Sequence, residues 1–271
     1  AVILFVRSAL SVALRRDWPA SLTAMFLTIM LFSTSSVLGV MTARRNLDYH
    51  SSIRMWTSVV RVRPLNYRGW SSLGAAYDLL GDQQRARECF ERAIAIQDQY
   101  PGALLGLGLC CLRMGDLDRA RWAFEKGLEA DPKMVDAASN LGVIAVRRGD
   151  HAAAIKHFDR AISIQPEFSV AHYNRADSLI ELGRDTEAVE ALLTALRIEP
   201  DFTQAARKLA WVRATSPNPA LREGSEAVQL VESKCQPNES QSIHTWDTYG
   251  AALAEAGRYD DAVRAADRAI E

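Results

Sequence analysis

Several residue types recur every 34 residues along most of this 271-residue chain. The glycines of this series are Gly81, Gly115, Gly149 and Gly183. Small and then bulky apolar residues follow at the same interval, as Ala86, Ala120, Ala154 and Ala188, and as Phe90, Phe124, Phe158 and Leu192. Such a period indicates stacked supersecondary units, each of which buries its apolar face only against its neighbours.

The physical role of each repeated residue can be inferred from its place in the unit. A first helix with apolar residues at helical spacing stops at the glycine, where a positive φ costs little. Aspartates then stand where they can cap a second helix, namely Asp82, Asp116 and Asp150. The alanine permits a close helix crossing, and the bulky residue fills the space beside it. Prolines that cannot continue a helix end the units, at Pro132, Pro166 and Pro200.

The pattern of residue types within a unit resembles the tetratricopeptide repeat. In the first full unit it is carried by Trp70, Leu73, Gly74, Tyr77, Ala86, Phe90 and Ala93. The resemblance implies an all-α solenoid, a right-handed superhelix of helix-turn-helix repeats, with four repeats over residues 67–202. Residues 203–242 then form a degenerate repeat, because Pro217 replaces the turn glycine and "SPNPA" lengthens the loop. Residues 243–271 form a final repeat that we interpret as truncated, since Val263, Ala266 and Ile270 have no following helix to cover them.

The register can also be extended toward the N-terminus. The series of prolines that end the units has no member at position 98, but Pro64 stands one period before that position. A helical segment precedes Pro64. In that segment Trp56 takes the place of Phe90, and Ser52 that of Ala86. Residues 44–66 are therefore predicted to contain a junction and a half-repeat capping helix.

Residues 18–43 contain no charged side chain, whereas arginines stand on both sides of them. This length is enough to cross a bilayer, and Trp18 at one edge is typical of a membrane boundary. The segment is therefore predicted to be a transmembrane helix, with residues 1–17 as a basic flanking segment. A buried core helix is the alternative, which the hydroxyl cluster Ser33–Ser36 keeps open. Because arginines flank both ends, charge does not select an orientation.

The junction from Thr42 to Gly74 resembles that of the membrane glycosyltransferases of the O-mannosyltransferase-like, transmembrane-and-tetratricopeptide type. This resemblance implies an integral membrane protein whose repeats lie on the periplasmic or lumenal side. It also implies that this segment is the non-catalytic, protein-binding C-terminal part of a glycosyltransferase-like chain. A membrane-anchored scaffold for envelope assembly or secretion, unrelated to sugar transfer, is the alternative.

No catalytic, metal or cofactor motif is recognisable in the sequence. The overall net charge is −1, and the basic excess is confined to residues 1–66, which favours a membrane surface over nucleic acid as a partner. Acidic pairs such as Asp116 and Asp118 stand at helix starts, where capping explains them. The four cysteines lack metal-ligand spacing and are predicted to be buried helical thiols. We therefore expect a segment that is not an enzyme and holds no cofactor.

The concave groove formed by the first helices is the predicted site for a protein or an extended peptide. Asn140 and Asn174 stand one period apart, and each amide can both donate to and accept from a peptide backbone. The pair resembles part of the asparagine ladder of O-GlcNAc transferase, although Ser72 and Gly106 interrupt that ladder here. The remaining candidates are Arg113 and Arg147, predicted to favour acidic flanks, together with Tyr173 and Asp177. The alternative is that all six are merely solvated polar residues.

Overall fold

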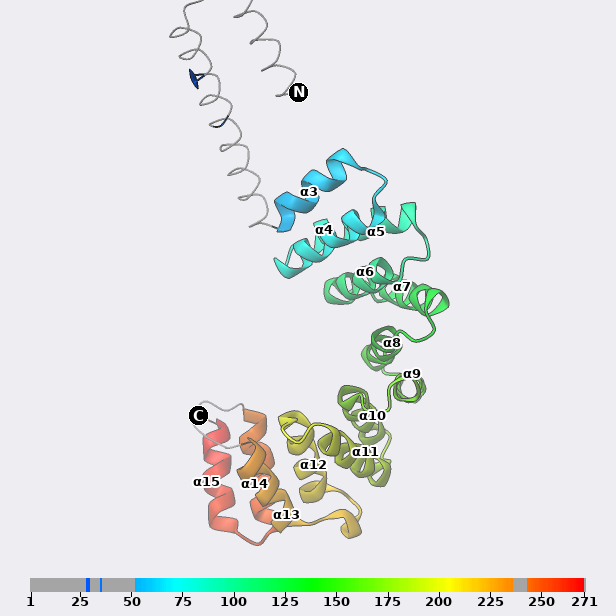
Figure 1. Ribbon diagram of the computed structural model, residues 1–271. Helices are drawn as coiled ribbons and strands as arrows, with labels where there is room; N and C mark the ends of the chain where they lie inside the picture. The colour runs from blue at the N-terminus through cyan, green and yellow to red at the C-terminus, as the bar shows by residue number, and fades with distance from the viewer. Residues whose placement is uncertain (1–27, 30–34, 36–51, 236–242, 271) are drawn as a thin grey trace, which may run out of the picture.

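The computed structural model of the protein describes residues 28–29, 35, 52–235 and 243–270 (Figure 1). Every regular element within these residues is helical, which confirms the predicted all-α repeat fold. The helix α3 (Ser52–Val62) comes first, and six helical pairs follow. The first helices of the pairs are α4 (Tyr67–Leu79), α6 (Pro101–Met114), α8 (Val135–Arg147), α10 (Ser169–Glu181), α12 (Thr203–Thr215) and α14 (Ile243–Glu255). The second helices are α5 (Gln83–Ile96), α7 (Leu117–Ala130), α9 (His151–Ile164), α11 (Asp185–Ile198), α13 (Gly224–Leu230) and α15 (Tyr259–Ile270).

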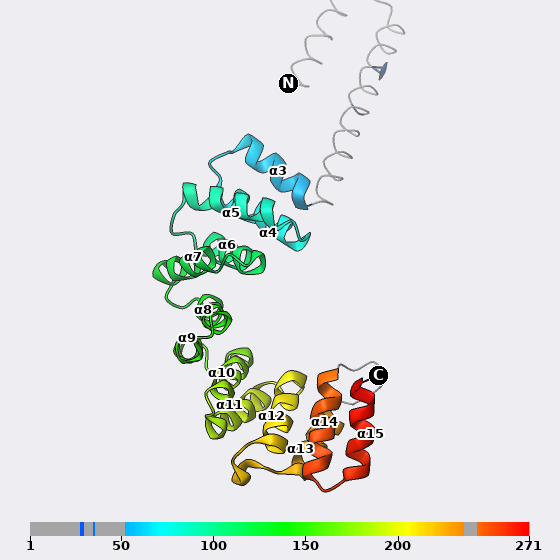
Figure 2. The ribbon, with the colours of Figure 1, turned by 180° about the vertical axis from the view of Figure 1, so that it is seen from behind.

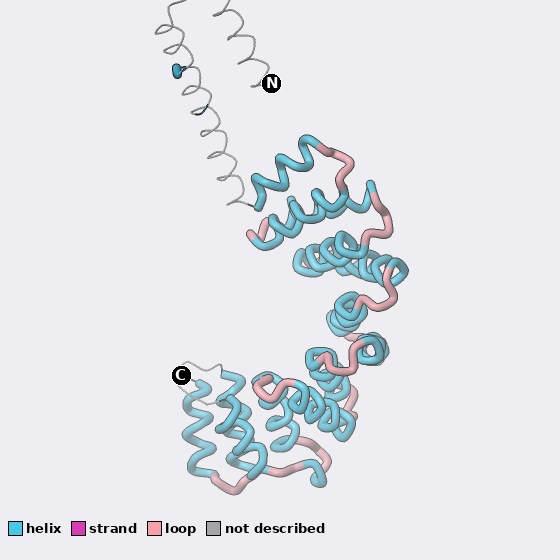
Figure 3. The backbone as a smooth tube through the Cα atoms, viewed as in Figure 1, coloured by secondary structure: helices cyan, strands magenta, loops and turns pink. Residues whose placement is uncertain are grey.

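The pairs stack side by side into an open arc, which is visible from both sides (Figures 1 and 2). The first helices line the inside of this arc, and the second helices form its outside. The tube in Figure 3 shows that the loops that join α3 to α4, α5 to α6 and α7 to α8 lie on the outer side of the arc. The concave surface is therefore built almost entirely from the exposed faces of α4, α6, α8, α10, α12 and α14.

The turn within each of the first four pairs has the predicted chemistry. Gly81, Gly115, Gly149 and Gly183 all adopt positive φ, between 71° and 81°. Immediately after the first three of these glycines, the aspartate side chains accept hydrogen bonds from backbone amides of the second helix at 2.9 to 3.1 Å. These caps satisfy amides that have no partner within the helix. The sharp turn is therefore encoded by a glycine followed by an aspartate.

Small residues allow the paired helices to approach closely. The four repeated alanines are fully buried, and the bulky residues that follow them are buried beside them. Those positions are Ala86, Ala120, Ala154 and Ala188, with Phe90, Phe124, Phe158 and Leu192. The resulting apolar core runs along the arc between the inner and outer helices rather than forming one central cluster, as expected for a solenoid.

The fifth pair differs from the others because its connection is longer and its second helix is irregular. After α12 the chain passes through a short 3₁₀ helix, η1 (Pro219–Leu221), before it enters α13, which continues as a π-helical turn, η2 (Val231–Cys235). Arg213 on α12 forms ion pairs of 3.1 Å with Glu223 at the end of the inserted loop and with Glu226 in the first turn of α13. Ser216 donates a hydrogen bond of 2.6 Å to Asp185 of the preceding unit. The insertion is thus held to the repeat stack on both sides.

The two ends of the described array differ in how they are covered. At the N-terminal end α3 packs on α4, and Trp56 contributes to a cluster that contains Leu73 and Cys89. At the other end the outer face of α15 exposes Val263 and Ile270. Most of residues 18–43, the predicted membrane helix, lies outside the described residues. Among the residues that are described, no helix combines the length and the apolarity needed to cross a bilayer.

Candidate functional site

The predicted asparagine ladder is interrupted for a packing reason. A Cβ atom at Gly106 would collide with the ring of Phe90, so the second unit has no room for a side chain at the ladder position. Asn140 is half-buried, and its amide donates 2.7 Å to the carbonyl of Asp136 in its own helix. The amide of Asn174 has no hydrogen bond with any described residue. Of the two predicted asparagines, Asn174 is therefore the more available to a ligand.

Each of the two predicted groove arginines contacts the preceding repeat of the same chain. One guanidinium nitrogen of Arg113 lies 2.6 Å from each carboxylate oxygen of Asp78, so this ion pair joins α6 to α4. Arg147 donates 2.9 Å to the carbonyl of Leu112 and thereby caps the C-terminal turn of α6 from α8. A peptide carboxylate would have to compete with Asp78 for Arg113. Their role in binding a partner stays a prediction.

The concave surface is hollowed where α10, α12 and α14 come together. A pocket of about 460 Å³ lies there, a size that suits one or two side chains. Its lining residues are Tyr173, Arg207, Lys208, Trp211, His244, Asp247, Thr248 and Ala251. All of them belong to first helices, so the pocket opens on the inside of the arc. It is the candidate site that the geometry of the described residues favours.

The charges of this pocket are only partly compensated. Lys208 pairs with Asp177 of the preceding first helix at 2.5 Å, which brings the predicted Asp177 to the pocket's edge. Arg207 is half-buried, and among the described residues its guanidinium has neither a hydrogen bond nor an ion pair. Asp247 on α14 is exposed and likewise lacks a described partner. The pocket therefore presents one uncompensated cation on α12 and one uncompensated anion on α14.

Aromatic rings form the apolar part of the pocket. Trp211 is 41% exposed, which is unusual for so large a side chain inside a concavity. The predicted Tyr173 packs against Phe202 with ring centroids 5.2 Å apart, and this contact fixes one wall. Ala251 is small and leaves room near Trp211. An apolar side chain can enter this space and cover the indole.

Only Tyr173 of the lining residues was among the predicted groove residues, although the 34-residue register points to more of them. Arg207 occupies the position of Tyr173 one repeat later, and Lys208 occupies that of Asn174. Once the six-residue insertion is allowed for, Asp247 follows in the position of Tyr173 and Arg207, and Thr248 follows in that of Asn174 and Lys208. Extension of these two neighbouring positions into the last two units would therefore have identified Arg207, Lys208, Asp247 and Thr248 as lining residues. Their convergence into a pocket depends on how α12 packs on α14.

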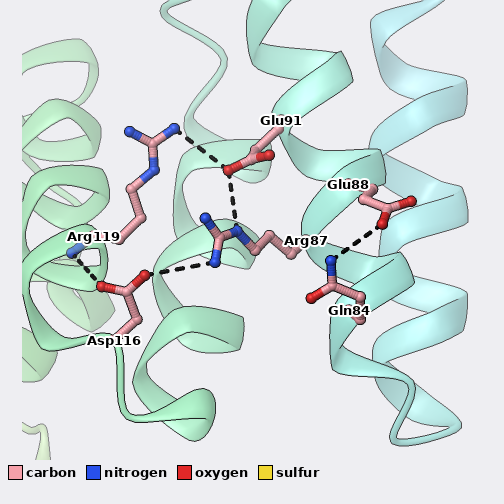
Figure 4. A network of polar contacts seen from close by, with 6 residues as sticks. All are labelled: Gln84, Arg87, Glu88, Glu91, Asp116 and Arg119. Carbon is pink, nitrogen blue, oxygen red and sulfur yellow. Dashed lines mark hydrogen bonds and ion pairs between the residues drawn. The ribbon is translucent and has the colours of Figure 1, made fainter.

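The outer face of the arc carries a different kind of polar network (Figure 4). Glu91 on α5 accepts from Arg87 of its own helix at 3.2 Å and from Arg119 of α7 at 3.4 Å. Arg87 also lies 3.6 Å from Asp116, which caps α7. These ion pairs join two repeats, and each charged group of the network has an oppositely charged neighbour. Nε of Arg119 is buried and has no hydrogen-bond partner among the described residues.

The cysteines have the environment of structural rather than reactive thiols. All four are buried and unpaired. Burial, assisted by Asp78, raises the pKa of the Cys110 thiol to about 12, and burial raises that of Cys89 to about 11. Protonated buried thiols are poor nucleophiles. Among the described residues, no group of three or more His, Cys, Asp or Glu side chains has a geometry that could hold a metal ion.

Comparisons with known proteins agree with this architecture. Three family profiles, each described as a tetratricopeptide repeat, match residues 39–169 in overlapping segments, residues 145–212 and residues 246–268. No curated protein matches the chain. Similar solved structures include PilF of Pseudomonas aeruginosa, with a TM-score of 0.64 and 17% identity over 73% of this chain and 88% of that one. Another is PilW, a widely conserved type IV pilus biogenesis factor, with a TM-score of 0.62 and 17% identity over 73% and 90%. A third is YrrB, described as a TPR protein with an unusual peptide-binding site, with a TM-score of 0.50 and 15% identity over 79% and 90%.

Proposed function

This chain belongs to the tetratricopeptide repeat family, and we propose that it is a non-catalytic module that binds an extended segment of a partner protein along its concave surface. The observation that carries the proposal is the pocket between α10, α12 and α14, which combines an exposed tryptophan with uncompensated charges. A surface made of rigid helices can hold a flexible peptide without itself paying an ordering cost. The description of YrrB as having a peptide-binding site supports the same use of this fold.

A photoreactive amino acid placed on either face of the arc tests this proposal. We would introduce benzoylphenylalanine at Asn140 or Asn174 on the inner helices and, as a matched control, at the exposed Arg197 on α11. Full-length protein in its native membranes is then irradiated, and the crosslinked segments are identified by mass spectrometry. We expect extended segments of partner chains to crosslink at the inner positions and not at Arg197. Equal crosslinking at both faces would exclude the groove as the binding surface.

A more specific proposal concerns the membrane. Residues 18–43 anchor the module, and the repeats lie on the periplasmic or lumenal side; the uncharged run and its flanking arginines support the anchor. Deletion of residues 1–47 should then release a helical protein into buffer, whereas the full chain should need detergent. Equal solubility of the two forms would contradict the anchor.

The nature of the anchored protein is open between two proposals. The junction from Thr42 to Gly74 favours the C-terminal part of a membrane glycosyltransferase-like protein. The structural similarity to a type IV pilus biogenesis factor favours a scaffold for envelope assembly or secretion. The coding sequence upstream distinguishes them. Many membrane helices with an acidic loop near the start would support the glycosyltransferase, and a short tail with a single anchor would exclude it.

A further inference from the structure

We infer that the pocket between α10, α12 and α14 is the selectivity site of the groove, and that it takes an acidic side chain next to an aromatic one in an extended peptide of a partner protein. This inference rests on the proposed function and specifies the chemistry of its ligand. It is carried by three features of the pocket, namely an arginine on α12 without a described partner, an exposed tryptophan and an anion on the adjacent helix α14.

The acidic preference comes from Arg207. Its neighbour Lys208 is neutralised by Asp177 at 2.5 Å, so Lys208 has little to offer a ligand. The guanidinium of Arg207 is half-buried and has no carboxylate partner among the described residues. A partly desolvated guanidinium gains most from a carboxylate, to which it can donate two parallel hydrogen bonds. A peptide aspartate or glutamate supplies that group.

The aromatic preference comes from Trp211 and its surroundings. About one helical turn separates Arg207 from Trp211, so both side chains lie on the same face of α12. The indole is 41% exposed, and Ala251 leaves space next to it in the pocket. Burial of an aromatic side chain against a tryptophan removes apolar surface of both rings from water. The acidic and aromatic groups of the ligand must therefore be close neighbours in its sequence.

Asp247 limits how acidic the ligand can be. It lines the wall formed by α14, and its carboxylate has no described partner. A second acidic group on that side would be repelled, whereas a neutral or basic group would be accepted. The same anion disfavours nucleic acid, which needs several uncompensated cations along one path. We therefore expect the bound peptide to place an acidic side chain next to α12 and no acidic side chain next to α14.

Four end-blocked, fluorescein-labelled octapeptides test the inference in solution by fluorescence anisotropy. The first contains an adjacent aspartate and phenylalanine within a Ser, Gly and Ala background. The other three replace the aspartate by asparagine, the aspartate by lysine, or the phenylalanine by alanine. With the full-length protein in detergent, we expect the aspartate peptide to bind about tenfold more tightly than the asparagine peptide, as for a hydrogen bond to a charged group. The lysine peptide should bind more weakly still.

Variants then assign each preference to a residue. Arg207→Gln should abolish the difference between the aspartate and asparagine peptides, and Arg207→Glu should favour the lysine peptide. Trp211→Ala should abolish the difference between the phenylalanine and alanine peptides. Matched controls on the outer helix α11, Arg197→Glu and Leu193→Ala, should leave all affinities unchanged, with the fold of every variant checked by circular dichroism.

The possible failures are separable. If none of the four peptides binds at millimolar concentration, or if the wild-type protein does not discriminate among them, the inference is overturned. It is also overturned if the Arg207 variants keep the aspartate preference. In these cases, crosslinking of extended segments at Asn174 would still uphold the proposed function. Loss of that crosslinking as well would overturn both.

Discussion

A Cβ atom built onto Gly142 would lie 2.5 Å from Cε1 of Phe158, so this glycine and this phenylalanine form one packing unit between α8 and α9. The same relationship recurs between Gly108 and Phe124. In the fourth repeat both partners change together, because Ala176 replaces the glycine and Leu192 replaces the phenylalanine. Ala176 and Leu192 are fully buried in the same cluster. The volume gained on the first helix is offset by the volume lost on the second.

Gly142→Ala should therefore destabilise the protein even though alanine favours helices more than glycine. Overpacking by one methyl group costs about 1–3 kcal/mol, which exceeds the helix-propensity gain of about 1 kcal/mol. The free energy of unfolding is to be measured by urea titration followed by circular dichroism. In the double variant Gly142→Ala, Phe158→Leu, the smaller leucine side chain should leave room for the added methyl group. The loss of unfolding free energy should then be smaller than the sum of the losses in the two single variants. Strict additivity would show that the two residues do not share the space.

His172 makes an interrepeat hydrogen bond that is equivalent to one made by Trp70. The indole nitrogen of Trp70 donates 2.8 Å to the carbonyl of Pro64, and Nε2 of His172 lies 2.9 Å from the carbonyl of Pro166. His172→Phe removes the donor and should cost about 0.5–1.5 kcal/mol of unfolding free energy. His172→Trp should restore much of it, because the indole can reach the equivalent carbonyl in the first repeat. Equal stabilities of the Phe and Trp variants in thermal unfolding would assign His172 to packing alone.

The ion-pair network on the outer face should behave differently from an isolated surface pair. Glu91 holds arginines from two helices, whereas Glu125 pairs with Arg121 of its own helix at 2.7 Å. Glu91→Gln should lower the unfolding free energy by up to about 1 kcal/mol, and Glu125→Gln by less. Both losses should shrink in high salt, because mobile ions screen exposed charges. Urea titrations of both variants at low and high ionic strength make the comparison, and identical losses would remove any special role for Glu91.

The buried thiols should make stability fall at alkaline pH. Burial first, and then Asp78, raises the pKa of Cys110 from 9.0 to about 12, so the folded state keeps this proton longer than the unfolded state does. The associated stabilisation is complete below pH 9.0 and is lost as pH rises toward about 12. Cys110→Ala should flatten this part of the pH profile relative to the wild-type protein. The decisive measurement is the difference between their unfolding free energies from pH 8 to pH 11; a constant difference would contradict the assigned pKa.

Much of this fold could be predicted from the sequence because its determinants are local. A positive φ at Gly81 and an aspartate cap at Asp82 act within a few residues, and repetition every 34 residues makes their pattern readable. Burial of the repeated alanines follows from the same register. Even the partners of His172 and Trp70 occupy equivalent positions. In a solenoid each unit contacts only its neighbours, so short-range rules suffice to place most of the core.

The state of the groove residues, by contrast, was decided by tertiary structure. Arg113 is bound to Asp78 and Asp177 to Lys208, because the spacing of adjacent helices brings their side chains together. A sequence shows which residues share one face of a helix. The distance between the faces of two neighbouring helices depends on how those helices pack. The pocket around Trp211 arises for the same reason, since α14 packs on α12 across an irregular fifth unit that its local sequence marks only as degenerate. Local chemistry thus determined the helices and their turns, and the packing between repeats determined which polar side chains remain free to bind a partner.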